Sequence, residues 1–212
     1  EIGILDAAMA LQAAGKVKYN DMGEMTKEEI DATIEALIEL KKQGHFRALW
    51  NTFDQSVQLM AAGEVVIQSM WSPAVTAVRS QGKACLYVPL KEGYRGWGNG
   101  ISLMKHLSGK KLDAAYEYLN WYLSGWMGGF IAKQGYYISV PETAKAFMTD
   151  DEWGYWYEGQ AAQNDITNPT GDKMESAGAK RDGGSYEERF SKIVVWNTFM
   201  KEAVYMNKRW ND

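Results

Sequence analysis

Aromatic residues with polar neighbours occur at four places where an apolar run ends or is interrupted. These places are Trp50-Asn51, Trp71-Ser72, Trp97-Gly98-Asn99 and Tyr136-Tyr137. Indole and phenol rings hold ammonium groups by cation–π attraction, at about 0.5–2 kcal/mol each, and they also stack on sugar rings. The neighbouring amides and hydroxyls donate and accept hydrogen bonds. Such a set of side chains is typical of a recognition site for an amine or a carbohydrate.

Residues suited to catalysis or metal binding are scarce in this chain. The two histidines, His45 and His106, stand apart from any cysteine or second histidine at ligand spacing. There is no Gly-x-Ser-x-Gly turn and no P-loop, and the glycines of 96–100 lack the dinucleotide-binding spacing. The acidic pairs at 150–152 and 187–188 precede apolar helical patterns, where they complement a helix dipole. We therefore expect no catalytic residue, no metal and no cofactor.

Composition and net charge limit the kinds of molecule that this chain can bind. The chain has 212 residues, 46% of them hydrophobic and 24% charged, which is ordinary for a folded globular protein. A net charge of −4 provides no basic surface for nucleic acid. The single cysteine, Cys85, excludes a disulfide within the chain and lies in an apolar run, where an inert thiol is expected. No apolar run approaches the length of a membrane span.

Hydrophobic periodicity predicts alternating helices and strands. The segment between Gly63 and Met104 contains two apolar strand-like runs separated by a short helix, which indicates a βαβ unit of a parallel sheet. Ligands of such sheets bind at the carboxyl ends of the strands, where Trp71 and Trp97 stand. Glycine-rich residues 164–184 predict a loop. We expect helices at 5–14, 26–43, 52–62, 72–81, 111–133, from 142 and at 185–210, and strands at 46–50, 64–70, 84–88 and 98–104. The helix at 26–43 should begin with a capping box of Thr26 and Glu29, and Ser72 should cap the helix at 72–81.

Five short motifs give the chain a family resemblance. It resembles the extracellular solute-binding proteins of bacterial ABC importers, and within them the spermidine/putrescine-binding proteins, over most of residues 46–148. The motifs are Leu59-Met60-Ala61-Ala62-Gly63-Glu64-Val65, Met70-Trp71, Pro89-Leu90-Lys91-Glu92-Gly93, Trp97-Gly98-Asn99 and Gly135-Tyr136.

The resemblance implies roles for particular residues. Trp71 corresponds to the cleft tryptophan at a strand end, Trp97 to a second cleft aromatic and Tyr136 to the tyrosine after the long helix. Polyamine binders carry an aspartate where this chain has Asn99, which bears no charge. Because an ammonium needs a carboxylate partner when it is buried, another acid must supply the charge or the ligand must differ.

Two acids are candidates for that missing carboxylate, Glu1 and Asp54. The expected ligand-binding set consists of these two acids, the family-matched residues Trp71, Trp97, Asn99 and Tyr136, and their neighbours or similar aromatic residues Trp50, Asn51, Ser72 and Tyr137.

The resemblance also implies an architecture. Its fold is α/β and two-lobed, of the periplasmic-binding-protein type II, with mixed, mainly parallel sheets. Residues 1–94 would form the second lobe, 95–165 the returning part of an incomplete first lobe, and 166–212 a C-terminal loop and helix. The chain opens on Glu1 inside a helical pattern, so we interpret it as truncated at its N-terminus, without a signal peptide. The turn at 91–96 is the expected hinge.

The functional prediction follows from the motifs and the resemblance together. We expect a periplasmic or extracellular solute-binding component of an ABC importer that captures a small amine-containing, polyamine-like solute and docks on the importer's membrane subunits. A receptor for a carbohydrate or an amino-acid derivative is the alternative, which Asn99 favours. An enzyme on a similar bilobal fold is the less favoured reading, because no acid, base or nucleophile set is present.

Overall fold

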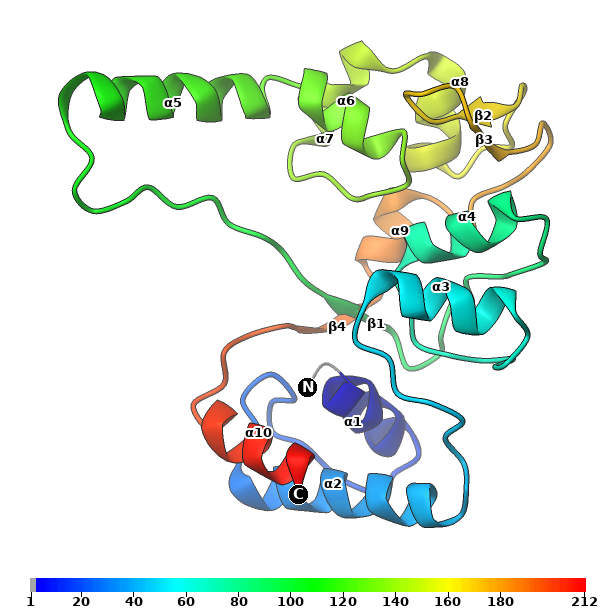
Figure 1. The fold of residues 1–212 in the computed structure, drawn as a ribbon, viewed down its shortest axis with the longest axis vertical. Helices are drawn as coiled ribbons and strands as arrows, with labels where there is room; N and C mark the ends of the chain where they lie inside the picture. The colour runs from blue at the N-terminus through cyan, green and yellow to red at the C-terminus, as the bar shows by residue number, and fades with distance from the viewer. Residues whose placement is uncertain (1–2) are drawn as a thin grey trace.

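The structure is a computed structural model that describes residues 3–212. Figure 1 shows a lower group of helices, a middle group, and an upper group from which a long helix extends. Long segments without regular structure join the groups. The predicted mixture of helices and strands is confirmed, although the strands are few and short.

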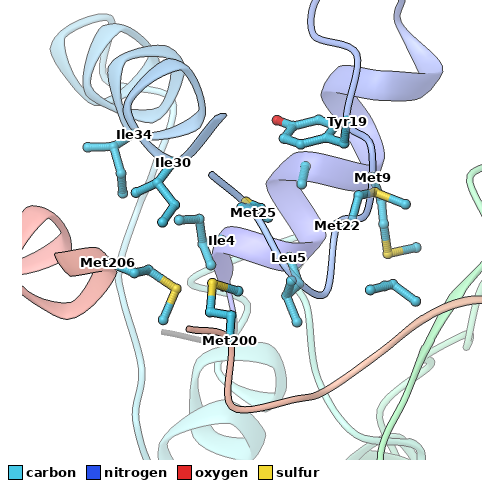
Figure 2. Packing of buried hydrophobic residues seen from close by; sticks show 12 residues of the cluster. Ile4, Leu5, Met9, Tyr19, Met22, Met25, Ile30, Ile34, Met200 and Met206 are labelled. Carbon is cyan, nitrogen blue, oxygen red and sulfur yellow. The ribbon is translucent and has the colours of Figure 1, made fainter. Parts of the chain in front are cut away.

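The lower group is the largest apolar core. It consists of α1 (Gly3–Ala13), α2 (Lys27–Lys42) and α10 (Ala203–Asn211). Ile4 and Ile30 are fully buried between these helices, and Figure 2 shows Met206 pointing toward them from α10. Asp31 accepts a hydrogen bond from Nε of Arg209 at 2.6 Å, which ties α10 to α2. The two ends of the chain therefore pack together.

Local capping signals place the first helices as predicted. Thr26 and Glu29 form the expected capping box at the start of α2. Thr52 caps α3 (Phe53–Ala61), and Gly63 follows it with a φ of +71°, the left-handed conformation that ends many helices. In α4 (Ser72–Ser80), Ser72 is the first helical residue and not the cap that we expected. The N-cap is Trp71, whose side chain accepts no capping hydrogen bond.

A short parallel sheet crosses between the lower and middle groups. β1 (Tyr94–Gly96) pairs with β4 (Ile193–Trp196), which joins segments about one hundred residues apart. At Gly93 the φ is +92°, and a Cβ there would lie 2.7 Å from the carbonyl oxygen of Lys192. Only glycine fits this approach. The structure therefore places a strand where the sequence predicted a polar turn at 91–96.

The predicted C-terminal helix 185–210 is wrong, because β4 interrupts it. The β-branched run from Ile193 to Val195 favours a strand once β1 is beside it. What forms instead is α9 (Tyr186–Phe190), then β4, then α10. The predicted loop 164–184 likewise contains an antiparallel hairpin, β2 (Ile166–Thr167) and β3 (Lys173–Glu175).

The upper group packs on a second, aromatic core. The predicted helix 111–133 breaks at Gly125, whose φ is +115° and whose missing side chain leaves room for the backbone of Thr143. Tyr155, Trp156 and Ile166 are buried beneath the shorter elements. The shorter elements are α6 (Trp126–Ala132), α7 (Pro141–Ala144), η1 (Lys145–Phe147), α8 (Asp150–Trp153) and the π-helical η2 (Gly154–Glu158). The longer helix α5 (Gly109–Leu123) extends away from this core and buries none of its residues.

The predicted strands 46–50, 64–70, 84–88 and 98–104 are absent from the described structure, and with them the βαβ unit. Val66 and Ile67 are 89% and 88% exposed. A buried parallel strand needs hydrogen-bonded neighbours, and within residues 3–212 none pairs with these runs. They are therefore extended segments that join helices. The two-lobed fold and the boundaries at residues 94 and 165 stay predictions.

Candidate functional site

The N-terminal ends of α3 and α4 bring two of the predicted aromatic residues together. The ring of Trp71 lies 5.1 Å from that of Trp50, edge to face, and 6.4 Å from that of Phe53. The indole Nε1 of Trp50 donates to the carbonyl oxygen of Ser69 at 3.0 Å. We call Trp50, Phe53 and Trp71 the tryptophan cluster. Each of its residues stands at the start of a helix or just before one, so the helix caps position the cluster.

Two predicted polar residues accompany this cluster. The backbone N–H of Asn51 donates to Oε1 of Gln55 at 3.1 Å, which orders the entry to α3. Asp54 is exposed on the first turn of α3. A shallow depression of about 340 Å³ opens on the Trp50 side and is lined by apolar side chains with Gln55, Gln58 and Glu64. Its lining contains both stacking and hydrogen-bonding groups.

An acid that the sequence analysis missed also reaches this segment. Oδ2 of Asp6, on α1, accepts from the hydroxyl of Ser69 at 2.6 Å. Its other oxygen, Oδ1, accepts from Nε of Arg95 at 3.1 Å. Asp6 therefore lies next to the residues that precede Trp71. Glu1, the predicted alternative, lies outside the described residues.

Ser72 belongs to a second, polar group on the other side of the start of α4. It is 6% exposed, and its Oγ accepts from Nη2 of Arg181 at 3.4 Å. The guanidinium of Arg181 lies over the ring of Trp156, 4.5 Å from its centroid. Cation–π contacts of this kind fix the orientation of the planar guanidinium.

Three tyrosines face the same group. The rings of Tyr87 and Tyr94 stack with centroids 6.0 Å apart. Burial raises the pKa of Tyr87, and the neighbouring phenols of Tyr137 and Tyr94 raise it further. Tyr137, a predicted site residue, also borders Arg189. Burial also raises the pKa of Tyr94, so the hydroxyls of Tyr87 and Tyr94 are neutral donors at physiological pH.

A network around Arg79 anchors this polar group. Arg79 donates to Oε1 of Glu175 at 2.8 Å and to Oδ2 of Asp182 at 2.5 Å. Burial lowers the pKa of Arg79, but the bonds and charges of the two acids outweigh it and raise the pKa overall. Asp182 also accepts from the backbone N–H of Tyr87 at 2.8 Å, which holds the segment of the predicted strand 84–88 beside α4.

The structure does not bring the remaining predicted residues into these groups. Trp97 and Asn99 follow β1 in an exposed extended segment, and Trp97 is 42% exposed. Tyr136 is also 42% exposed, unlike its buried neighbour Gly135. Within the described chain neither Trp97 nor Tyr136 contacts another aromatic ring. Their part in a site stays a prediction.

Three further residues missed by sequence reasoning come from the predicted loop and the helix that follows it. Arg181, Asp182 and Arg189 lie within or just after the glycine-rich stretch 164–184. Two arginines flanking Gly183-Gly184 were the available signal, because glycine allows backbone and ligand to approach closely. Some of their partners are distant in sequence, because Ser72 lies 109 residues before Arg181 and Arg79 lies 103 residues before Asp182.

Comparison with known families identifies the class of protein. Residues 3–153, well over half of the chain, match the family described as bacterial extracellular solute-binding protein. The chain belongs to this family. Membership implies a small-molecule solute, an exported or periplasmic location and the membrane subunits of an ABC importer as partner. Solute-binding proteins of this family are typically non-enzymatic.

Two further findings accompany the family match. No solved structure matches the chain. Among residues 3–212, no helix has both the length and the apolar composition needed to cross a bilayer.

Proposed function

We propose that this solute-binding protein captures a small amine-containing solute for an ABC importer, without a catalytic step, and that the tryptophan cluster forms the amine end of its site. The observation that carries the proposal is the edge-to-face packing of Trp50 on Trp71 at 5.1 Å. This packing gathers aromatic rings at a helix start, and an ammonium over the face of one ring gains cation–π attraction of about 0.5–2 kcal/mol.

The acid required by a bound ammonium has a candidate in Asp6. Its hydrogen bond to Ser69 places a carboxylate beside the segment leading to Trp71. This supports a carboxylate from α1 in place of the aspartate that polyamine binders carry where this chain has Asn99. A polyamine-like solute is the specificity that the sequence motifs favour, and an amino-acid derivative is the second candidate, favoured by Arg181 beside Ser72.

The two-lobed organisation is part of the proposal. Residues 1–94 and 95–165 would form the jaws, with residues 91–96 as the hinge and Trp97, Asn99 and Tyr136 joining the site when the jaws close. The crossing of β1 and β4 supports this, because two distant segments run side by side at the proposed boundary.

Titration calorimetry tests the amine site. The protein is titrated with putrescine, spermidine, 4-aminobutyrate and glucose, and then the Trp71→Ala variant is titrated with whichever compound binds. We expect an amine to bind, glucose to give no heat, and Trp71→Ala to weaken binding by about 2- to 30-fold, the equivalent of one cation–π contact.

The matched control is Trp121→Ala, which removes a half-exposed tryptophan on the distant helix α5. It should bind like the unmodified protein. Binding of glucose alone, or equal affinity in both alanine variants, would contradict the amine site.

A further inference from the structure

Three buried hydrogen-bond donors beside Arg181 have no partner within residues 3–212. They are the hydroxyl of Tyr94, Nε of Arg189 and Nε1 of Trp156, in side chains that are 9%, 5% and 3% exposed. A buried donor without a partner costs about 1–3 kcal/mol, so proteins rarely keep three together. What these atoms share is that they can donate. The group that satisfies them must accept, as a carboxylate does.

Arg189 keeps its Nε without a partner in the described chain, although the phenol of Tyr137 lies beside its guanidinium. Its Nη1 donates to the carbonyl oxygen of Gly184 and its Nη2 to that of Trp156 at 3.1 Å. Trp156 lies in the π-helical turn η2, a type of turn that is frequent at functional sites. Burial lowers the pKa of Arg189, and the charge of Arg181 lowers it further, so the two guanidinium groups repel each other.

The buried charges here do not balance. Glu175 and Asp182 are both engaged by Arg79, while Arg181 and Arg189 form no salt bridge in the described part of the chain. Glu188, on the same helix as Arg189, is exposed and accepts from the backbone N–H of Ser185. Two half-buried acids thus face three arginines. One further negative charge would complete the group.

The space beside these donors is small. Gly183 has no side chain, and a Cβ there would lie 3.0 Å from the Tyr94 hydroxyl and 3.2 Å from Cγ of Arg189, so these two side chains close on the glycine. A cavity of about 10 Å³, the size of one water molecule, lies among Ser72, Arg181 and Asp182 at the uncapped start of α4, so a carboxylate fits there only when the side chains separate. The positive end of the helix dipole adds to the attraction for an anion.

We propose that Arg181, the Tyr94 hydroxyl, Nε of Arg189 and the start of α4 bind a carboxylate group of the solute. The proposal rests on the proposed solute-binding function and narrows its ligand class. Trp71 and Ser72 are consecutive residues, so the tryptophan cluster and the carboxylate subsite meet at the start of α4. A short molecule with an amine at one end and a carboxylate at the other spans both. The ligand is therefore an amino acid or amino-acid derivative, and a simple polyamine lacks the group that Arg181 binds.

Compounds of matched length separate the two classes. Calorimetry compares putrescine with 4-aminobutyrate and cadaverine with 5-aminopentanoate, in which a carboxylate replaces one amine, and includes butyrate as the carboxylate without an amine. We expect the amino acids to bind at least about tenfold more tightly than the diamines, because a charged hydrogen-bonded pair is gained.

The variant Arg181→Met removes the guanidinium and keeps an apolar side chain over Trp156. This variant should bind the amino acids at least about tenfold more weakly, and its affinity for the diamines should be unchanged or improved. Arg181→Lys retains the charge without the planar guanidinium, so its affinity for the amino acids should lie between those of Arg181→Met and the native protein. Arg47→Met, which removes an exposed arginine paired with Glu64 beyond the subsite, is the matched control and should bind normally. Circular dichroism melting establishes that each variant is folded.

The outcomes separate this proposal from the amine site. If diamines bind and depend on Trp71 while the amino acids bind no better, the amine site stands and the carboxylate subsite is overturned. If butyrate and the amino acids bind through Arg181 but are insensitive to Trp71→Ala, the subsite stands and the amine site fails. If no compound of either series binds, both are overturned. Equal effects of Arg181→Met and Arg47→Met would also overturn the subsite.

Discussion

The helices around Ile30 and the residues around Arg189 show two different ways of filling an interior. In the lower group, isoleucines and methionines from α1, α2 and α10 pack with each other and need nothing more (Figure 2). In the group around Arg189, buried arginines and tyrosines keep donors without partners. Apolar side chains fill the first core, whereas the second keeps three unpaired donors, which is why we propose the second as a binding site.

The largest effect should come from creating a cavity in the apolar core of the lower group. Ile30→Ala removes a fully buried side chain and should lower the free energy of unfolding by about 2–5 kcal/mol, because the cavity cannot collapse fully. Urea denaturation measures this loss. Ile38→Ala, on the half-exposed side of the same helix, is the control and should cost much less. Similar losses for both would show that this interior is loosely packed.

A smaller effect should come from the network that supports the polar group. Arg79→Met leaves Glu175 and Asp182 without their partner and should lower the unfolding free energy by about 1–3 kcal/mol, less than a fully buried pair would lose. The same variant should bind anionic compounds more weakly, because the negative charges of the two acids next to the proposed subsite are then no longer neutralised.

Arg79→Lys keeps the charge, but its single ammonium cannot bind both carboxylates as the planar guanidinium does. Its unfolding free energy and its affinity for anionic compounds should therefore lie between those of Arg79→Met and the native protein. Denaturation and calorimetry measure the two effects separately. Native stability in Arg79→Met would mean that the network does not hold this region together.

The smallest effect is expected in the apolar segments outside both interiors. Val66 is 89% exposed, so Val66→Thr should change the unfolding free energy by no more than about 0.5 kcal/mol. Thermal melting measures the change, with Val78→Thr, fully buried in α4, as the destabilised reference. A loss in Val66→Thr as large as that in Val78→Thr would show that residues 64–70 form a buried strand after all.

Helix boundaries were the most predictable part of this fold. Thr26 with Glu29, Thr52, Gly63 and Gly82 mark helix ends through contacts that span at most a few residues, and each does so in the structure. The acidic pairs at 150–152 and 187–188 likewise lie in first helical turns. Such contacts are visible in the sequence because both partners lie in the same short window.

Strands were predicted less well, since a strand depends on a neighbour that a local window does not contain. The apolar run at 64–70 has the composition of a buried strand yet finds no partner in the described chain, whereas the polar turn at 91–96 becomes β1 because Gly93 lets it approach β4. A hydrophobic pattern shows that a segment is suited to a buried strand, but it does not show whether the fold places a partner strand beside it.

The candidate site divides in the same way. Trp50 and Trp71 were predictable because each precedes a helix whose start is encoded locally, and the two helices are neighbours in sequence. Ser72 was predicted, but Arg181, its partner 109 residues later, was not. By itself the sequence determined the solute-binding family, the ends of the first four helices and the aromatic half of the proposed site. Only the tertiary structure decided which arginines face that half, because the contact depends on packing between distant segments that no local pattern encodes.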